Sequence, residues 1–278
     1  MIELAPNHKM GLPVANPILL AGGIIGCGEA VPPGLELSRL GAVVVGPVMA
    51  TGSPGAPLPR LAHTQGGCVL EAGSQNRGVG AVLRRFASLW PSLGVPVVLQ
   101  LADREPRLLA RTVARVESVP GLAGLELVLP GDGDLAQARS LVRRATRETE
   151  LPLWVKLPLP QAEAWAEAAV EAGAAGLVVG QPPTGALMRP WRGEPVPVRG
   201  SLYGPLAFGL MLEKLLAVAE LALPCALIAC GGIHTWEQVQ QALAAGAQAV
   251  QIDVATWVEP ALPGQLAQTW AGSKPMGE

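Results

Sequence analysis

The sequence predicts an α/β protein, a (β/α)8 TIM barrel formed as a single domain over residues 1–278. Half of the residues are hydrophobic and only 15% are charged, which is typical of a chain with a large buried core. Eight short apolar runs alternate with longer amphipathic segments, as in a barrel of parallel strands and helices. A doubly wound open sheet is the alternative fold, but it seldom needs eight units, and no linker divides the chain.

Each apolar run is too short for a helix and is rich in Val, Leu or Ile, as expected for a strand buried on both faces. The eight runs cover residues 17–23, 41–48, 95–102, 124–130, 151–158, 175–181, 225–232 and 249–256.

Amphipathic segments between the runs predict helices, the clearest over 104–119, 134–150, 161–173 and 235–246. Thr235 is placed as an N-cap with Gln238 completing a capping box. Gly173 and Gly246 follow the last helical turn, where a left-handed residue is needed. Two further stretches, 51–68 and 182–205, are long Pro- and Gly-rich connections, and we expect them to be loops that act as lids over the catalytic face.

Charge and cysteine usage exclude several classes of function. The net charge is −2 without a basic block, so neither nucleic acid nor a membrane surface is expected as a partner. The N-terminus does not resemble a signal peptide, and no apolar stretch is long enough to span a membrane. Cys27, Cys68, Cys225 and Cys230 lack CxxC spacing, which predicts reduced, structural thiols, no metal site and a cytoplasmic protein.

The last two runs predict a phosphate-binding cup. The seventh run ends in Gly231-Gly232 and the eighth in Asp253-Val254. In (β/α)8 barrels the loops after these two strands often bind phosphate through backbone N–H groups. Gly-Gly can also make a simple tight turn, and Asp253 places a carboxylate where a phosphate needs donors. A like-charge contact of this kind costs about 1–3 kcal/mol or more, unless Asp253 points away toward solvent or toward arginines such as Arg189, Arg192 and Arg199.

Motifs along nearly the whole chain resemble, in order, those of the dihydroorotate dehydrogenase family. The stretches that carry the resemblance are NPILLAGGIIGCGEA, SQNRGVGAVL, PLWVKLP, EAGAAGLVVGQPPTGA, GSLYGP and CGGIHTWEQVQQALAAGAQAVQIDVATWVEP. The resemblance, to class 1-like members that use FMN, implies a (β/α)8 barrel with FMN at the mouth.

Particular residues match positions with known roles in that family. Lys156 matches a lysine beside the flavin ring, where its charge could stabilise a reduced flavin. Asn76 matches an asparagine that binds an orotate-like ring, and Gln181 stands where another asparagine belongs. The resemblance places the remaining cofactor contacts at Ala21, Gly23, Gly204, Gly231, Gly232, Asp253 and Val254.

The chain also departs from the family pattern. ELVLPGDG, residues 126–133, replaces Asn-x-Ser-Cys-Pro-Asn, so Val128 stands for an asparagine and the catalytic-base Cys or Ser is missing. A strand-two lysine is replaced by Gly46 or Pro47, and an asparagine of the substrate loop by Leu70. Asp253-Val254 replaces Gly-Thr. Asp132 and Asp134 are substitute candidates for the base, although Gly-Asp-Gly-Asp is more often a solvated turn before a helix.

Three functions stay open at this point. The first is an FMN-dependent oxidoreductase acting on dihydroorotate or a related ring, as in pyrimidine biosynthesis. The second is a barrel without turnover that serves as a binding or assembly partner. The third is a lyase that uses Lys156 as a Schiff-base amine. The family resemblance favours the first, and it implies a homodimer and, in some members, an electron-transfer subunit.

Overall fold

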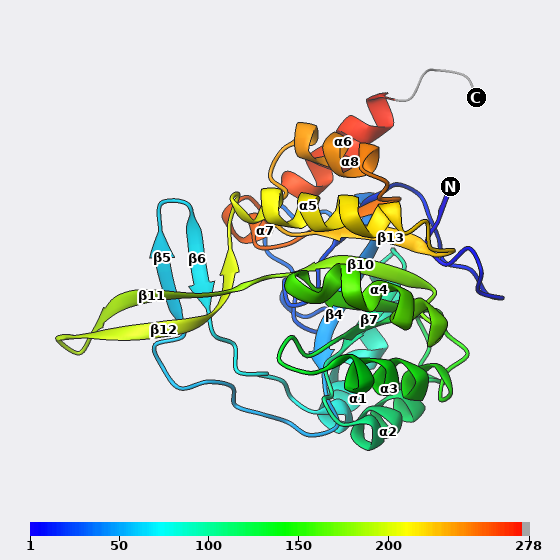
Figure 1. Ribbon diagram of the computed structural model, residues 1–278, viewed down its shortest axis with the longest axis horizontal. Coiled ribbons are helices and arrows are strands. Elements are labelled where there is room, and N and C mark those ends of the chain that lie inside the picture. The colour runs from blue at the N-terminus through cyan, green and yellow to red at the C-terminus, as the bar shows by residue number, and fades with distance from the viewer. Residues whose placement is uncertain (274–278) are drawn as a thin grey trace.

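The computed structural model describes residues 1–273, and its centre is a closed barrel of eight strands (Figure 1). All neighbouring strands of the barrel run parallel. Each predicted apolar run contributes one strand, so the predicted (β/α)8 barrel is confirmed. In chain order the strands are β3 (Ile18–Leu20), β4 (Ala42–Val48), β7 (Val97–Leu101), β8 (Leu122–Val128), β9 (Leu153–Pro158), β10 (Gly176–Gln181), β13 (Ala226–Cys230) and β14 (Ala249–Ile252).

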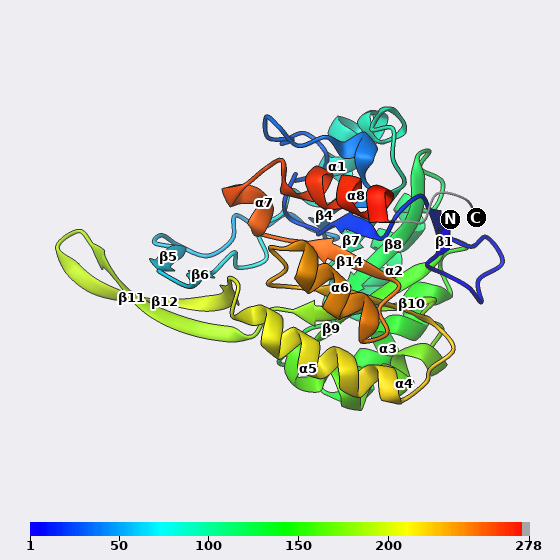
Figure 2. The same cartoon turned by 90° about the horizontal axis from the view of Figure 1, so that it is seen from above.

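Helices surround the barrel and cover the outer face of the strands (Figures 1 and 2). Because the strands are covered on both faces, they are buried along almost their whole length. Only the 3-10 helix η1 (Leu37–Arg39) follows β3, so the first unit has no α-helix. The α-helices are α1 (Val79–Phe86), α2 (Pro106–Val116), α3 (Leu135–Thr146), α4 (Ala162–Glu171), α5 (Ala207–Glu220), α6 (Trp236–Ala244), α7 (Ala255–Val258) and α8 (Leu262–Ser273), and two further 3-10 helices are η2 (Ala87–Ser92) and η3 (Leu159–Gln161).

The helix ends predicted from the sequence are confirmed. Thr235 accepts a hydrogen bond from the backbone of Gln238, whose side chain accepts one from the backbone of Thr235, as in a capping box. Gly173 and Gly246 have backbone φ values of 108° and 106°, which residues other than glycine rarely adopt. No helix in residues 1–273 is long and apolar enough to cross a membrane.

A short hairpin closes the end of the barrel where the strands begin. It consists of β1 (Ile2–Glu3) and β2 (Pro13–Val14), which pair in antiparallel register. The buried indole of Trp154, near the start of β9, donates a hydrogen bond of 2.9 Å to the carbonyl of Leu4. Figure 2 shows this hairpin on the side of the molecule opposite the long β11–β12 arm, so the functional mouth lies at the other end.

The two segments expected to be loops form strands of a second sheet over much of their length, whereas residues 51–60 are irregular as expected. The order of this antiparallel sheet is β11 (Thr184–Trp191), β12 (Glu194–Tyr203), β6 (Gly67–Leu70) and β5 (Leu61–Thr64). Pairing of β12 with β6 joins residues far apart in the sequence, such as Tyr203 with Cys68. A separate small core of Ala62, Val69 and Val198 stabilises the sheet. The sheet extends from the carboxyl end of the barrel (Figure 1).

Candidate functional site

A cavity of about 590 Å³ opens where the barrel strands end. This volume lies in the range of small-molecule sites, about 300–1,000 Å³. Its wall combines the ends of β3, β4, β7 and β14 with the segment between β4 and α1 and with the end of β12. The lining residues are Gly22, Gly23, Ile24, Gly26, Cys27, Glu29, Gly46, Pro47, Ser53, Arg60, Leu70, Ala72, Ser74, Gln75, Asn76, Arg77, Gln100, Tyr203, Asp253, Val254 and Trp257.

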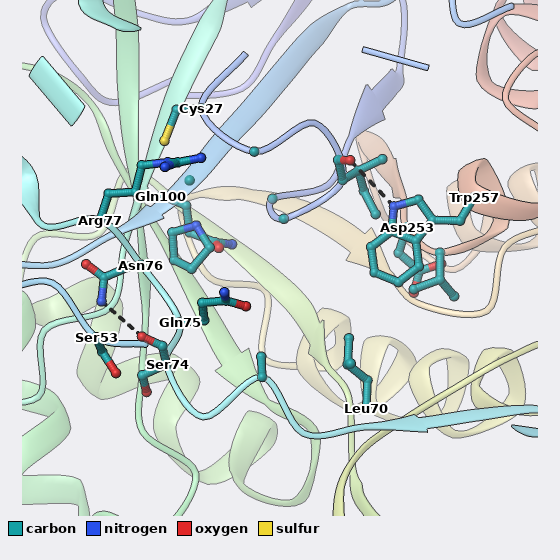
Figure 3. Close-up of a pocket in the computed structure, with 18 of the residues that line it drawn as sticks. Cys27, Ser53, Leu70, Ser74, Gln75, Asn76, Arg77, Gln100, Asp253 and Trp257 are labelled. Carbon is teal, nitrogen blue, oxygen red and sulfur yellow. Dashed lines mark hydrogen bonds between the residues drawn. The ribbon is translucent and has the colours of Figure 1, made fainter. Parts of the chain in front are cut away.

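The cavity has two chemically different sides. Figure 3 shows Cys27, Asn76 and Arg77 on one side, and Asp253 and Trp257 on the other. Asn76 is held by local bonds: its amide nitrogen donates 2.9 Å to the carbonyl of Ser74, and its amide oxygen accepts 2.8 Å from the N–H of Gly78. The predicted substrate residue Asn76 therefore lines the cavity in a fixed orientation.

Lys156 lies inside the barrel in a network of buried polar side chains. Its ammonium donates 2.8 Å to the amide oxygen of Gln251 and lies 3.6 Å from the Glu126 carboxylate. Glu126 also accepts hydrogen bonds of 2.6 Å from Gln100 and 2.5 Å from Gln251. Gln100 is the member of this network that lines the cavity, so the network connects the interior charge pair to the floor of the site.

The environment of Lys156 keeps its side chain protonated. Burial lowers its pKa, but the Cys230 sulfur and the Glu126 carboxylate more than reverse this, so the pKa is raised overall. Burial raises the pKa of Cys230 to about 12, so this group is a neutral thiol at pH 7. The Glu126 carboxylate is therefore the charge that stabilises the ammonium. A Schiff-base lysine needs a neutral amine, so this geometry disfavours the lyase hypothesis.

Asp253 lies buried at the predicted phosphate cup. The residue is 7% exposed, and burial raises its pKa despite the opposing effects of His234 and Lys156. Backbone N–H groups of Ala255 and Gly232 face the carboxylate and also act to lower its pKa. Its Oδ1 atom nevertheless has no hydrogen-bond partner among the described residues. The carboxylate thus points into the cup and is only partly compensated there.

The other predicted cofactor residues lie around this cup at different depths. Gly23 and Val254 line the cavity, whereas Ala21 is buried beside β14 and donates 2.9 Å to the carbonyl of Ile252. A Cβ on Gly232 would lie 2.2 Å from the backbone nitrogen of Phe208, and one on Gly204 would lie 2.2 Å from the carbonyl oxygen of Gly66. These two glycines are required for close backbone packing.

Gly231 and Gln181 lie near the cup without lining the cavity. Gly231 has space where a side chain would lie, with the carbonyl oxygen of Gly180 3.9 Å away. Gln181 is half-buried, and its side-chain oxygen has no hydrogen-bond partner among the described residues. The predicted substrate-binding role of Gln181 stays a prediction.

The two aspartates considered as substitute bases lie outside the cavity lining. The Asp132 side chain is 71% exposed and forms an ion pair with Arg104, whose hydrogen bond lowers the Asp132 pKa. Asp134 is the N-cap of α3 and accepts 2.7 Å from the N–H of Gln137. Both carboxylates have structural partners, as the alternative interpretation of Gly-Asp-Gly-Asp expected.

Sequence reasoning did not single out several lining residues, including Glu29, Arg77, Gln100, Tyr203 and Trp257. Gln100 carries a signal, because it is a polar residue inside the apolar run VVLQL. Arg77 carries another, because it directly follows Asn76. Tyr203 and Trp257 carry no local signal, since they reach the cavity only through the pairing of β12 with β6 and the turn after β14.

Fold and cavity together define an enzyme-type (β/α)8 barrel, with its site at the carboxyl ends of the strands. A sequence profile of the dihydroorotate dehydrogenase family matches residues 7–269. The chain belongs to this family.

Curated relatives cover almost the same length. The chain is 31% identical over 271 residues to a dihydroorotate dehydrogenase B (NAD(+)) catalytic subunit of Desulforudis audaxviator, covering 92% of this chain and 88% of the relative. Subunits of the same name from Desulforamulus reducens and Pelobacter propionicus are 30% and 28% identical, over 94% and 93% of this chain and 90% and 89% of theirs.

Members of this family generally use FMN, and the cavity fits one part of that molecule better than the other. Gly22 and Gly23 form a wall of bare backbone, and a Cβ added at Gly23 would meet nothing within 4 Å. Such a wall fits a flat ring. At the cup, the buried and only partly compensated Asp253 carboxylate disfavours a phosphate. The residues present therefore fit the uncharged part of a flavin and not its phosphate.

Proposed function

We propose that the protein is an oxidoreductase of the dihydroorotate dehydrogenase type, acting on dihydroorotate or a related ring in pyrimidine biosynthesis. The observation that carries this proposal is the cavity of about 590 Å³ at the strand ends of a barrel that belongs to this family. The proposed cofactor is a flavin, FMN in the family, and Gly22, Gly23 and Gln100 are the residues proposed to face its ring.

The proton acceptor is proposed to be Glu29. Oxidation of a dihydroorotate ring requires a base that takes the proton from C5, and the loop after β8 provides none that lines the cavity. Glu29 lines it, accepts 2.6 Å from the N–H of Cys27 and lies 3.5 Å from Arg77. Burial, and next the Glu29 charge, raise the pKa of Cys27 to about 11, so this thiol is a poor base at neutral pH.

A spectrum and an assay test the proposal together. Purified protein is expected to release a flavin that absorbs in the visible range, and to oxidise dihydroorotate with a quinone or fumarate as acceptor. Glu29→Gln is expected to lower kcat by about 10²–10⁴-fold, since it removes a positioned base. Glu259→Gln, at an exposed position outside the cavity lining, is the matched control.

The outcomes separate the parts of the proposal. Protein that neither holds nor binds any flavin, and oxidises no dihydroorotate, would refute the oxidoreductase function. Turnover that is unchanged in Glu29→Gln would remove Glu29 as the base and leave the rest intact.

A partner is also proposed. The relatives are named catalytic subunits, so we propose that this chain passes electrons to a separate electron-transfer subunit. The homodimer and the cytoplasmic location stay predictions.

A further inference from the structure

The cup at the end of β13 and β14 already contains an anionic group. Backbone N–H groups of Gly232 and Ala255 face the Asp253 carboxylate. These N–H groups come from the two strand ends where (β/α)8 barrels often bind phosphate. The carboxylate of the protein therefore lies beside the backbone donors that a ligand phosphate would need.

No cation is paired with this carboxylate in residues 1–273. None of the salt bridges there includes Asp253, and Lys156 is paired with Glu126. Of the arginines considered from the sequence, Arg189 donates to the carbonyl of Leu61 and stacks over Trp191. Burial lowers the pKa of His234 although Asp253 opposes this, so the imidazole is neutral at pH 7.

The side chain of the neighbouring residue also offers a phosphate no donor. Val254 lines the cavity, and its side chain has no hydroxyl. The Oδ1 atom of Asp253, in contrast, is a buried acceptor that has no partner within residues 1–273. The cup thus has no side-chain hydroxyl at Val254, and it contains the buried Asp253 carboxyl group, whose Oδ1 atom has no hydrogen-bond partner among the described residues.

A phosphate monoester carries about −1.5 to −2 charges at pH 7 and would repel this carboxylate. A ligand that ends in a hydroxyl would instead donate to Oδ1 and add no charge. We propose that the Asp253 carboxylate takes the place of the cofactor phosphate, so that the cavity selects a flavin without a phosphate, of the riboflavin type, over FMN. This inference rests on the proposed flavin function and specifies its ligand.

Titration of apo-protein with riboflavin and with FMN, followed by quenching of flavin fluorescence at pH 7.5, tests the inference. The native protein is expected to bind riboflavin at least about tenfold more tightly than FMN. Asp253→Asn keeps the size of the side chain and removes its charge, and Asp253→Gly removes both. Both variants are expected to bind FMN at least about tenfold more tightly than the native protein does.

Controls keep the result interpretable. Glu259→Gln removes an exposed carboxylate six positions along the chain and is expected to leave both affinities unchanged. Circular dichroism of each variant establishes that it is folded, and two different replacements at Asp253 guard against failure of one.

Each outcome has one meaning. Equal or tighter binding of FMN by the native protein overturns the inference and leaves the proposed oxidoreductase intact. FMN affinity that stays unchanged in both Asp253 variants also overturns it. Absence of any flavin binding, in the native protein and in both variants, overturns the inference together with the proposed flavin cofactor.

Discussion

Glu126 and Asp253 are two buried carboxylates of the same barrel, and their surroundings differ. Glu126 is fully buried inside the barrel and has three partners, the amides of Gln100 and Gln251 and the ammonium of Lys156. Asp253 lies at the mouth, and one of its oxygens has no partner among the described residues. Burial therefore does not distinguish a structural carboxylate from one available to a ligand; the completeness of its hydrogen bonding does.

The largest loss of stability is expected when the buried ion pair between Lys156 and Glu126 is broken. Lys156→Met leaves the Glu126 charge buried without its cation, which should lower the free energy of unfolding by about 3–5 kcal/mol. Urea unfolding measures this loss. The double variant Lys156→Met with Glu126→Gln is the control and should recover part of it, because no buried charge is then left unpaired. A loss below about 1 kcal/mol in the single variant would show that the pair is not the stabilising element.

A smaller change in stability is expected when Asp253 is replaced at the cup, and here the variant should be more stable than the native protein. The Asp253 pKa is raised in the folded protein. The contribution of this group to the free energy of unfolding is therefore present at low pH and is lost as the pH rises through the folded-state pKa. Asp253→Asn has no such loss. Its Tm should exceed that of the native protein at pH 8, and the difference should narrow toward pH 4.

Other titratable groups around Asp253 are common to both proteins in this comparison. They are His234, Lys156, Tyr203, Cys68 and Cys230. Subtracting the two Tm–pH curves gives the contribution of the Asp253 carboxylate together with its electrostatic coupling to these groups. A native protein that is more stable than Asp253→Asn at pH 8 would show that the carboxylate is compensated in solution.

The smallest effect is expected at an exposed carboxylate. Asp132→Asn removes the ion pair with Arg104, which solvent screens because both side chains are more than half exposed. The unfolding midpoint and the flavin affinities should both stay unchanged. A marked loss of turnover in this variant would return Asp132 to consideration as the base.

Local patterns in the sequence were sufficient for the barrel. The eight apolar runs became eight strands, and Thr235, Gln238, Gly173 and Gly246 fixed helix ends as expected. These features depend on neighbours within a few residues, so the sequence contains the information directly. The second sheet was not predicted, because β12 and β6 pair across a large sequence separation and their Pro- and Gly-rich composition is typical of loops.

For the site, the sequence by itself determined which residue types were present: a lysine on a buried strand, an asparagine before a glycine turn, and an aspartate after the last strand. Only the tertiary structure decided the charge states of these side chains and the groups that they face. Lys156 meets Glu126 and Gln251 because closure of the barrel brings β8, β9 and β14 to one interior. Asp253 faces the backbone of Gly232 because β13 and β14 are neighbours. Electrostatic compensation depends on distances in space, and spacing along the chain does not specify them.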